Sequence, residues 1–333
     1  MVRLTGERTT AYYWFVSEIG AAVRAVRHRM VSRWDHGVID LLAVACITAV
    51  GCSPETNTKE GFLHEGTSLR AAADKGDVKA QRQLGSIYRS GLGAPQDPSQ
   101  AALWYRKAAE RGDAAAQHEL GVMYFTGEGV AENFGEAASW IRKAANQGFA
   151  AAQSDLGEMY KVGLGVSADY AQSAAWFRKA AEQGNAIAQY NTGLAYRDGQ
   201  GVPRDDRQAL VWFRKAAEQG DADAESALGT AYLNGRGIAE DHAQAVWWYR
   251  KSAEHGSALA QYLLGMQFAK GDGVPRDLVA ALEWLDIATA RSTRQSRQKF
   301  AAARDEVARE VDAQQLAEAR RRAAEQESRH KQQ

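Results

Sequence analysis

The sequence predicts an all-helical protein, a right-handed α-solenoid of six helix–turn–helix repeats. A tryptophan returns every 36 residues without an insertion, at Trp104, Trp140, Trp176, Trp212, Trp248 and Trp284. Glycines recur at fixed points of the same period, and alanine is abundant whereas proline is scarce, with 5 prolines in 333 residues. A fixed period of this length indicates one supersecondary unit that buries its apolar face on the next copy.

Each repeat is expected to open with a helix that packs closely on its neighbours. Side chains suited to capping a helix N-terminus precede it at Asp77, Asp113, Asn185 and Asp221. Within the helix, a small residue, a Leu-Gly pair and an aromatic residue share one face, as at Ala116, Leu120, Gly121 and Tyr124. Glycine inside a helix costs about 1 kcal/mol relative to alanine. Its recurrence at this position therefore predicts the close approach of another helix.

The second helix of each repeat is expected to follow a Gly-x-Gly turn, and it carries the tryptophan and an Arg-Lys pair. It ends at a glycine that supplies a left-handed cap, at Gly112, Gly148, Gly184, Gly220 and Gly256. Because the tryptophan is constant, we expect it in the core. The Arg-Lys pairs, balanced by nearby acids, are expected on a solvated face. A turn that joins two helices lacks the strand-to-helix setting of a phosphate site.

The repeats are predicted to fill residues 62–290, with units that start near positions 77, 113, 149, 185, 221 and 257. Residues 62–75 are expected to form a capping helix before the first full unit. Residues 291–333 are heavily charged, and we expect capping helices and a tail there, because the terminal units of a solenoid need a polar outer face.

The first 52 residues are predicted to be a leader sequence. Residues 41–50 are apolar and uncharged, follow several arginines, and end shortly before Cys52. Residues 49–52 resemble a bacterial lipobox, which implies lipidation of Cys52. A plain signal or short anchor, and an irregular apolar N-terminus on a cytoplasmic protein, stay open as alternatives. The apolar run is roughly half of the ~20 residues needed to span a bilayer.

Met30 is a possible true start of the chain, since it would give a leader of ordinary length. The polar residues 53–61 are expected to form a flexible tether between the lipid and the repeats. This interpretation places the protein in the cell envelope, facing the periplasm. Ser53 after the cysteine favours the outer membrane by analogy with bacterial lipoproteins.

The pattern A-x-x-x-L-G-x-x-Y-x-x-G-x-G-V, followed by A-x-x-W-x-x-K-A-A-x-x-G, extends over residues 77–290. It resembles the Sel1-like repeat, a relative of the tetratricopeptide repeat. The resemblance implies an α-solenoid that acts in protein–protein interaction, and with the lipobox-like segment it implies a bacterial lipoprotein.

In the related tetratricopeptide arrays, side chains of the first helix line a concave groove. The positions two before, two after and five after the leucine vary among the repeats, while the core positions do not. We therefore predict a protein-binding groove at Arg82, Ser86, Arg89, His118, Val122, Phe125, Ser154, Glu158, Lys161, Tyr190, Leu194, Arg197, Ser226, Thr230, Leu233, Tyr262 and Met266. Phe125, Tyr190, Leu233 and Tyr262 are expected to be exposed anchors. The alternative is that exposed positions drift freely.

The sequence therefore predicts a non-enzymatic scaffold or adaptor of the cell envelope that binds an unidentified protein or peptide. The 41 basic and 41 acidic residues argue against a nucleic-acid partner. No cofactor or metal is expected, because the histidines lack the spacing of metal ligands. Two alternatives are a structural lipoprotein of an exopolysaccharide or secretion machine, and an envelope hydrolase acting on β-lactam or peptidoglycan.

Overall fold

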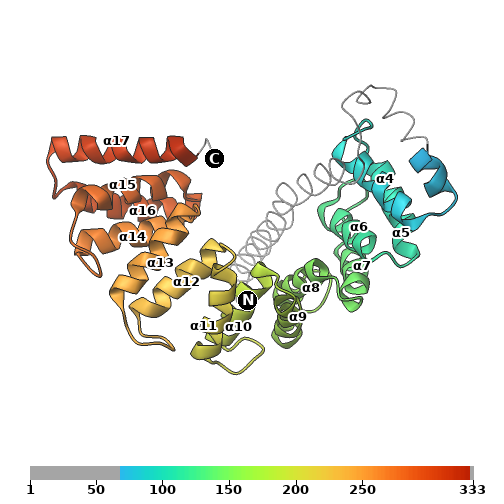
Figure 1. Ribbon diagram of the computed structural model, residues 1–333, viewed down its shortest axis with the longest axis horizontal. Coiled ribbons are helices and arrows are strands. Elements are labelled where there is room, and N and C mark those ends of the chain that lie inside the picture. Colours follow the sequence, from blue (N-terminus) through green and yellow to red (C-terminus); the bar gives the residue numbers. More distant parts are fainter. Residues whose placement is uncertain (1–67, 331–333) are drawn as a thin grey trace, which may run out of the picture. The chain divides into compact units, whose positions relative to one another are not determined.

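The computed structural model describes residues 68–330 of the chain (Figure 1). Within this range all regular secondary structure is helical, and no β-strand is present. The described residues form two compact units, which are divided between residues 180 and 181. The predicted all-helical repeat fold is confirmed.

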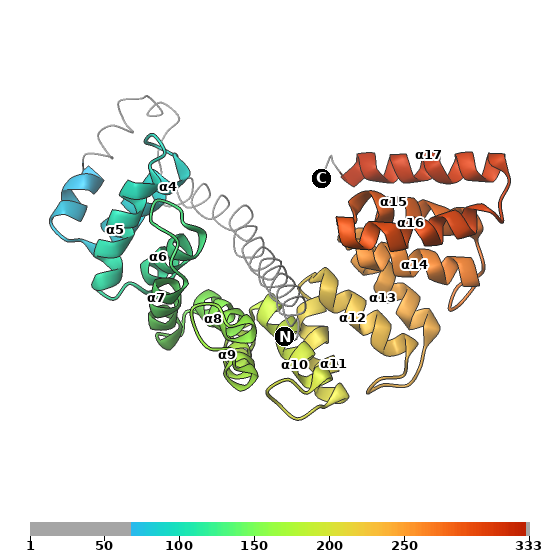
Figure 2. The same cartoon turned by 180° about the vertical axis from the view of Figure 1, so that it is seen from behind.

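The described part of the first unit contains three pairs of helices. A helical segment at residues 68–74 is followed by α4 (Val78–Ser90), α5 (Pro98–Glu110), α6 (Ala114–Thr126), α7 (Phe134–Asn146), α8 (Ala150–Val162) and α9 (Tyr170–Glu182). From α4 to α8, each helix packs on the next one along the chain (Figures 1 and 2).

The second unit continues with the same helix pairs and ends in two longer helices. These are α10 (Ala186–Asp198), α11 (Asp206–Ala217), α12 (Ala222–Leu233), α13 (His242–Glu254), α14 (Ala258–Lys270), α15 (Leu278–Arg291), α16 (Arg294–Ala308) and α17 (Ala313–His330). Both α16 and α17 pack on α15. Although α16 lacks the Leu-Gly motif, it begins 36 residues after α14, so it keeps the spacing of the repeats.

Capping side chains begin both helices in every repeat except the third, where Phe149 precedes α8 without a capping hydrogen bond. The predicted caps Asp77, Asp113, Asn185 and Asp221 each accept a hydrogen bond from a backbone N–H of the first helical turn. The second helices have caps of the same kind, which the sequence analysis did not anticipate, at Asp97, Asn133, Asp169, Asp205, Asp241 and Asp277. The glycines predicted to end the second helices have positive φ angles, for example +90° at Gly184. Local side chains therefore set the length of each helix.

The glycine of the Leu-Gly pair allows the two helices of a repeat to touch. A Cβ atom added at Gly229 would lie 2.7 Å from the ring of Tyr249, and one at Gly121 would lie 2.6 Å from Ile141. The residue that packs on the glycine always follows the tryptophan, and it is deeply buried in every repeat: Tyr105, Ile141, Phe177, Phe213, Tyr249 and Leu285. The predicted close approach is confirmed, and this residue makes it.

The tryptophans lie at the edge of the core, where lysines cover them. Trp104 is buried, whereas Trp140 and Trp176 are only half-buried. The lysine of the Arg-Lys pair places its ammonium group over the indole ring three residues earlier, at 3.8 Å for Lys107 and 3.7 Å for Lys143. A cation over an indole face is attracted by the ring's electrons. The lysines of the solvated face therefore also stabilise the tryptophans.

The arginine of the same pair links one repeat to the next. Arg142 in α7 donates a hydrogen bond to the hydroxyl group of Tyr160 in α8 at 3.1 Å, and Arg106 makes the equivalent bond to Tyr124. The aromatic residue of the first helix is thus held by the preceding second helix. Sequence reasoning treated these arginines only as solvated charges and missed this contact.

The Gly-x-Gly turn also packs on the preceding repeat. Gly163 ends α8 with a φ of +76°, and Gly165 follows with a φ of +68°. A Cβ atom at Gly165 would lie 1.9 Å from the carbonyl oxygen of Phe134, at the start of α7. Only glycine fits there, so the contact between neighbouring repeats requires the second glycine of the turn.

A buried glutamine makes a further link between repeats. Gln117 donates its amide hydrogen bond to the carbonyl oxygen of Ala109 at 2.9 Å, and the same bond is made by Gln81, Gln153, Gln189 and Gln261. The fifth repeat has Glu225 at this position, fully buried. Its Oε2 lies 2.8 Å from Nδ1 of His255, while its Oε1 has no hydrogen-bond partner among residues 68–330.

The predicted leader, the lipidation site Cys52, the tether at residues 53–61 and the start of the predicted capping helix at 62–67 lie outside the described residues. Among residues 68–330, no helix is both long and apolar enough to cross a membrane.

Candidate functional site

Many of the predicted groove residues make contacts within the chain. Arg82 pairs with the capping Asp113 at 3.3 Å, and His118 lies 2.8 Å from Asp155 in the next first helix. Glu158 pairs with Lys161 at 3.7 Å. Further contacts within the chain are made by Ser86, Arg89, Leu194, Leu233, Tyr262 and Met266. Much of the variation among repeats thus reflects different ways of joining neighbouring helices.

The expectation that Phe125 is exposed is wrong, because its side chain is 0% exposed. Its ring packs against the ring of Phe134 at the start of α7, with 5.2 Å between centroids. Val122 and Ser154 are also buried, so they do not offer an accessible surface either. These side chains fill space between helices, which is where apolar and small residues are most stable.

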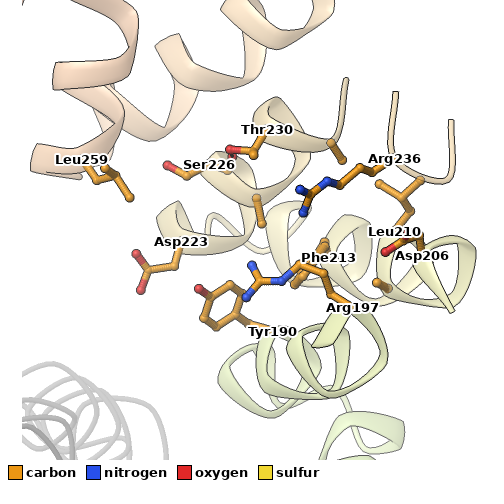
Figure 3. Close-up of a pocket in the computed structure, with 13 residues that line it drawn as sticks. Tyr190, Arg197, Asp206, Leu210, Phe213, Asp223, Ser226, Thr230, Arg236 and Leu259 are labelled. Carbon is orange, nitrogen blue, oxygen red and sulfur yellow. Dashed lines mark hydrogen bonds between the residues drawn. The ribbon is translucent and has the colours of Figure 1, made fainter. Parts of the chain in front are cut away.

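Four predicted groove residues come together in one pocket of the second unit (Figure 3). Tyr190 and Arg197 belong to α10, and Ser226 and Thr230 belong to α12. The pocket has a volume of about 150 Å³. Sites for drug-sized ligands usually enclose about 300–1,000 Å³. The pocket is therefore matched in size to a single side chain of a partner.

The pocket also contains residues that the sequence analysis did not select. Phe213 and Leu210 of α11 supply apolar surface, while Asp206, Asp223 and Arg236 supply charge. Tyr190 lies against Phe213, with ring centroids 5.8 Å apart. Arg236 is the middle residue of a Gly-x-Gly turn, and the variation of this position among repeats was a signal that could have identified it.

Two ion pairs hold part of the charge around the pocket. Arg197 donates to both carboxylate oxygens of Asp198, at 2.7 and 2.8 Å, and these hydrogen bonds lower the pKa of Asp198. Arg204 pairs with Oδ2 of Asp206 at 2.8 Å. Arg236 is exposed, and residues 68–330 provide no ion-pair partner for it.

Two titratable groups of the second unit lie outside the pocket but close to its helices. Burial raises the pKa of Asp221, the cap of α12, to about 6. Hydrogen bonds with Asp272 and then Glu240 raise the pKa of His242, which joins the start of α13 to the turn after α14. Within the described part of the chain, no group of three or more His, Cys, Asp or Glu side chains is arranged to hold a metal ion.

Helix pairs that repeat every 36 residues, and contact one another through their turns and caps, define a helical-repeat protein. The Sel1 repeat model matches six segments, residues 78–113, 114–149, 150–185, 186–221, 222–257 and 258–292, and the chain belongs to the Sel1 repeat family. Sel1 repeat proteins generally serve as scaffolds for protein interaction.

The solved structure of a Sel1 repeat protein agrees with this assignment. A Sel1 repeat protein from Oxalobacter formigenes is 33% identical, with a TM-score of 0.63, and the match covers 69% of this chain and 92% of that chain. A protective antigen of uropathogenic Escherichia coli with an SLR fold is 30% identical, with a TM-score of 0.41, over 81% of this chain and 72% of that chain. No curated protein matched the chain.

Proposed function

We propose that the protein is a non-enzymatic scaffold of the bacterial cell envelope, and that the pocket between α10, α11 and α12 anchors a segment of its protein partner. One observation carries the proposal. The positions selected because they vary among repeats include Tyr190, Arg197, Ser226 and Thr230, and these four line one pocket. A scaffold needs variable side chains on a constant frame, and this pocket combines the two.

The chemistry of the pocket suits a polypeptide segment. Arg236 offers hydrogen-bond donors, and Oδ1 of Asp206 is a buried acceptor without a partner in residues 68–330. A polypeptide carries both N–H donors and C=O acceptors at every residue apart from proline. Phe213 and Leu210 add an apolar surface on which a partner side chain can be buried.

Site-specific photocrosslinking in cells tests this proposal. A benzoylphenylalanine residue is placed either at Leu259, which lines the pocket and is 50% exposed, or at Val211, which is 47% exposed on α11 and does not line it. We expect a defined protein adduct from position 259 and none from position 211. The partner is then identified and purified, and Tyr190→Ala should weaken its binding to the full chain at least tenfold. Equal adducts from both positions, or none from position 259, would contradict the proposal.

The envelope location is part of the proposal and is supported by the leader-like sequence that ends at Cys52. Labelling of cells with radioactive palmitate tests it. The natural chain should incorporate label and shift in size when its leader is cleaved, while Cys52→Ala should do neither. A chain that is processed normally after Cys52→Ala would show that Cys52 is not the lipidation site.

A further inference from the structure

The first unit contains an arginine that is held by two carboxylates from the next repeat. Arg89 at the end of α4 donates through Nη1 to Glu119 at 2.8 Å and through Nη2 to Glu128 at 2.7 Å. Glu119 belongs to α6, and Glu128 is the middle residue of the following Gly-x-Gly turn. The Arg89 side chain is only 9% exposed, so this arginine is almost fully enclosed by the chain itself.

The same three positions recur 108 residues later with the carboxylates removed. Arg197 stands at the position of Arg89, while Ala227 and Arg236 stand at the positions of the two glutamates. All three of these residues line the pocket of the second unit. The arginine that two carboxylates enclose in the first unit therefore has a counterpart in the second unit that lines a pocket.

Arg236 is the cation of the pocket that has no ion pair in the described residues, although it lies close enough to Asp198 to help lower the pKa of that carboxyl group. Arg197 and Asp206 already form ion pairs with near neighbours, whereas Arg236 has none in the described part of the chain. Figure 3 shows the guanidinium groups of Arg197 and Arg236 both directed into the pocket. Asp223 also lines the pocket, and in the view of Figure 3 its carboxylate points away from Arg236.

We propose that the pocket binds an aspartate or glutamate side chain of the partner, held by Arg197 and Arg236. This inference rests on the proposed function and specifies which partner chemistry the site selects. At Arg197 the partner carboxylate takes the place that Glu119 occupies beside Nη1 of Arg89, because Asp198 already accepts from Nε and Nη2 of Arg197. Arginine is suited to this because its planar guanidinium group forms paired hydrogen bonds with a carboxylate. The small volume of the pocket fits one such side chain.

Binding of a defined acidic probe tests the inference. Fluorescein-labelled hexaglutamate and hexaglutamine peptides are titrated with the full chain, and fluorescence anisotropy is measured at low and at moderate salt. We expect hexaglutamate to bind at least tenfold more tightly than hexaglutamine, and more weakly as salt rises. Arg236→Gln should weaken hexaglutamate binding at least fivefold. Arg236→Glu should abolish it, because the new carboxylate recreates the arrangement at Glu128.

The matched control is Arg294→Gln, which removes the same charge from an exposed position on α16 of the same unit. It should leave hexaglutamate binding unchanged. Equal binding of the two peptides, or an equal loss with Arg294→Gln and Arg236→Gln, would overturn the inference. If the crosslinked partner needs Tyr190 but binds Arg236→Gln normally, the scaffold function stands and the carboxylate inference fails. Circular dichroism confirms that each variant is folded.

Discussion

Replacing Glu225 by glutamine should stabilise the protein. In five of the six repeats a glutamine at this position donates to a carbonyl oxygen eight residues earlier, and the equivalent oxygen in the fifth repeat belongs to Ala217. A carboxylate has no proton to donate to that oxygen. Glu225→Gln supplies the missing donor and keeps an oxygen that can accept from His255.

The expected gain follows from the two atoms concerned. Oε1 of Glu225 is buried without a partner in residues 68–330, and leaving such a group unpaired costs about 1–3 kcal/mol. A charge attraction to His255 would be lost, but that side chain is 48% exposed, so the attraction is weak. The free energy of local unfolding at the contact between α11 and α12 should therefore rise by about 1–2 kcal/mol.

Hydrogen–deuterium exchange at pH 7 is the suitable assay, because repeat arrays can unfold locally and a single melting temperature would average over both units. Amides at the end of α11 and the start of α12 should exchange roughly five- to thirtyfold more slowly in Glu225→Gln. The reciprocal change, Gln189→Glu in the preceding repeat, should speed the exchange of amides at the contact between α9 and α10. Unchanged or faster exchange in Glu225→Gln would refute the reasoning, since it would mean that Oε1 is already satisfied.

Four further predictions concern packing and pH. Gly229→Ala would place a Cβ atom 2.7 Å from the Tyr249 ring and should destabilise the second unit by about 1–3 kcal/mol in urea unfolding. Gly135→Ala, at an exposed helical site whose nearest atom is 3.4 Å away, should instead stabilise its unit by about 0.5–1 kcal/mol. Because the pKa of Asp221 is raised from 3.8 to about 6, the folded chain loses stability as pH rises between these values. Asp221→Asn should therefore be the more stable protein above pH 6, by about 1–3 kcal/mol, and equal to the natural chain below pH 4. The pKa of His242 is raised above 6.5, so its contribution is complete below that pH and is lost as pH rises through the folded-state pKa. His242→Gln should thus lower stability at pH 6 and have less effect at higher pH; a constant difference across pH would contradict the assignment.

Features that repeat could be predicted from the sequence. The helix pairs, the caps such as Asp113 and the close approach at Gly121 each depend on residues within one unit or on the same residue in every unit. The same local sequence signals occur in each of the six repeats, and they predict the same helix pair each time. The tryptophan was a sound guide to the period, although the residue after it packs more tightly against the glycine.

The site could be predicted only in part, because contacts between neighbouring repeats depend on pairs of residues. Phe125 and Arg197 occupy the same position of their repeats, yet the first packs on Phe134 and the second lines a pocket. What decides the outcome is a side chain 9 residues away in one case and 39 residues away in the other, at Arg236. A single helix face, taken without its neighbours, cannot contain that information.

The glycine turns have a consequence for how such a chain can change in evolution. Gly165 contacts the backbone at the start of α7. The length of the turn is therefore constrained by the preceding repeat as well as by its own repeat. An inserted residue would shift that contact and misplace every helix that follows. The array can therefore gain or lose whole units much more readily than single residues. Helix α16 begins 36 residues after α14 even though it lacks the Leu-Gly motif. The spacing of the helices is therefore kept more strictly than their sequence.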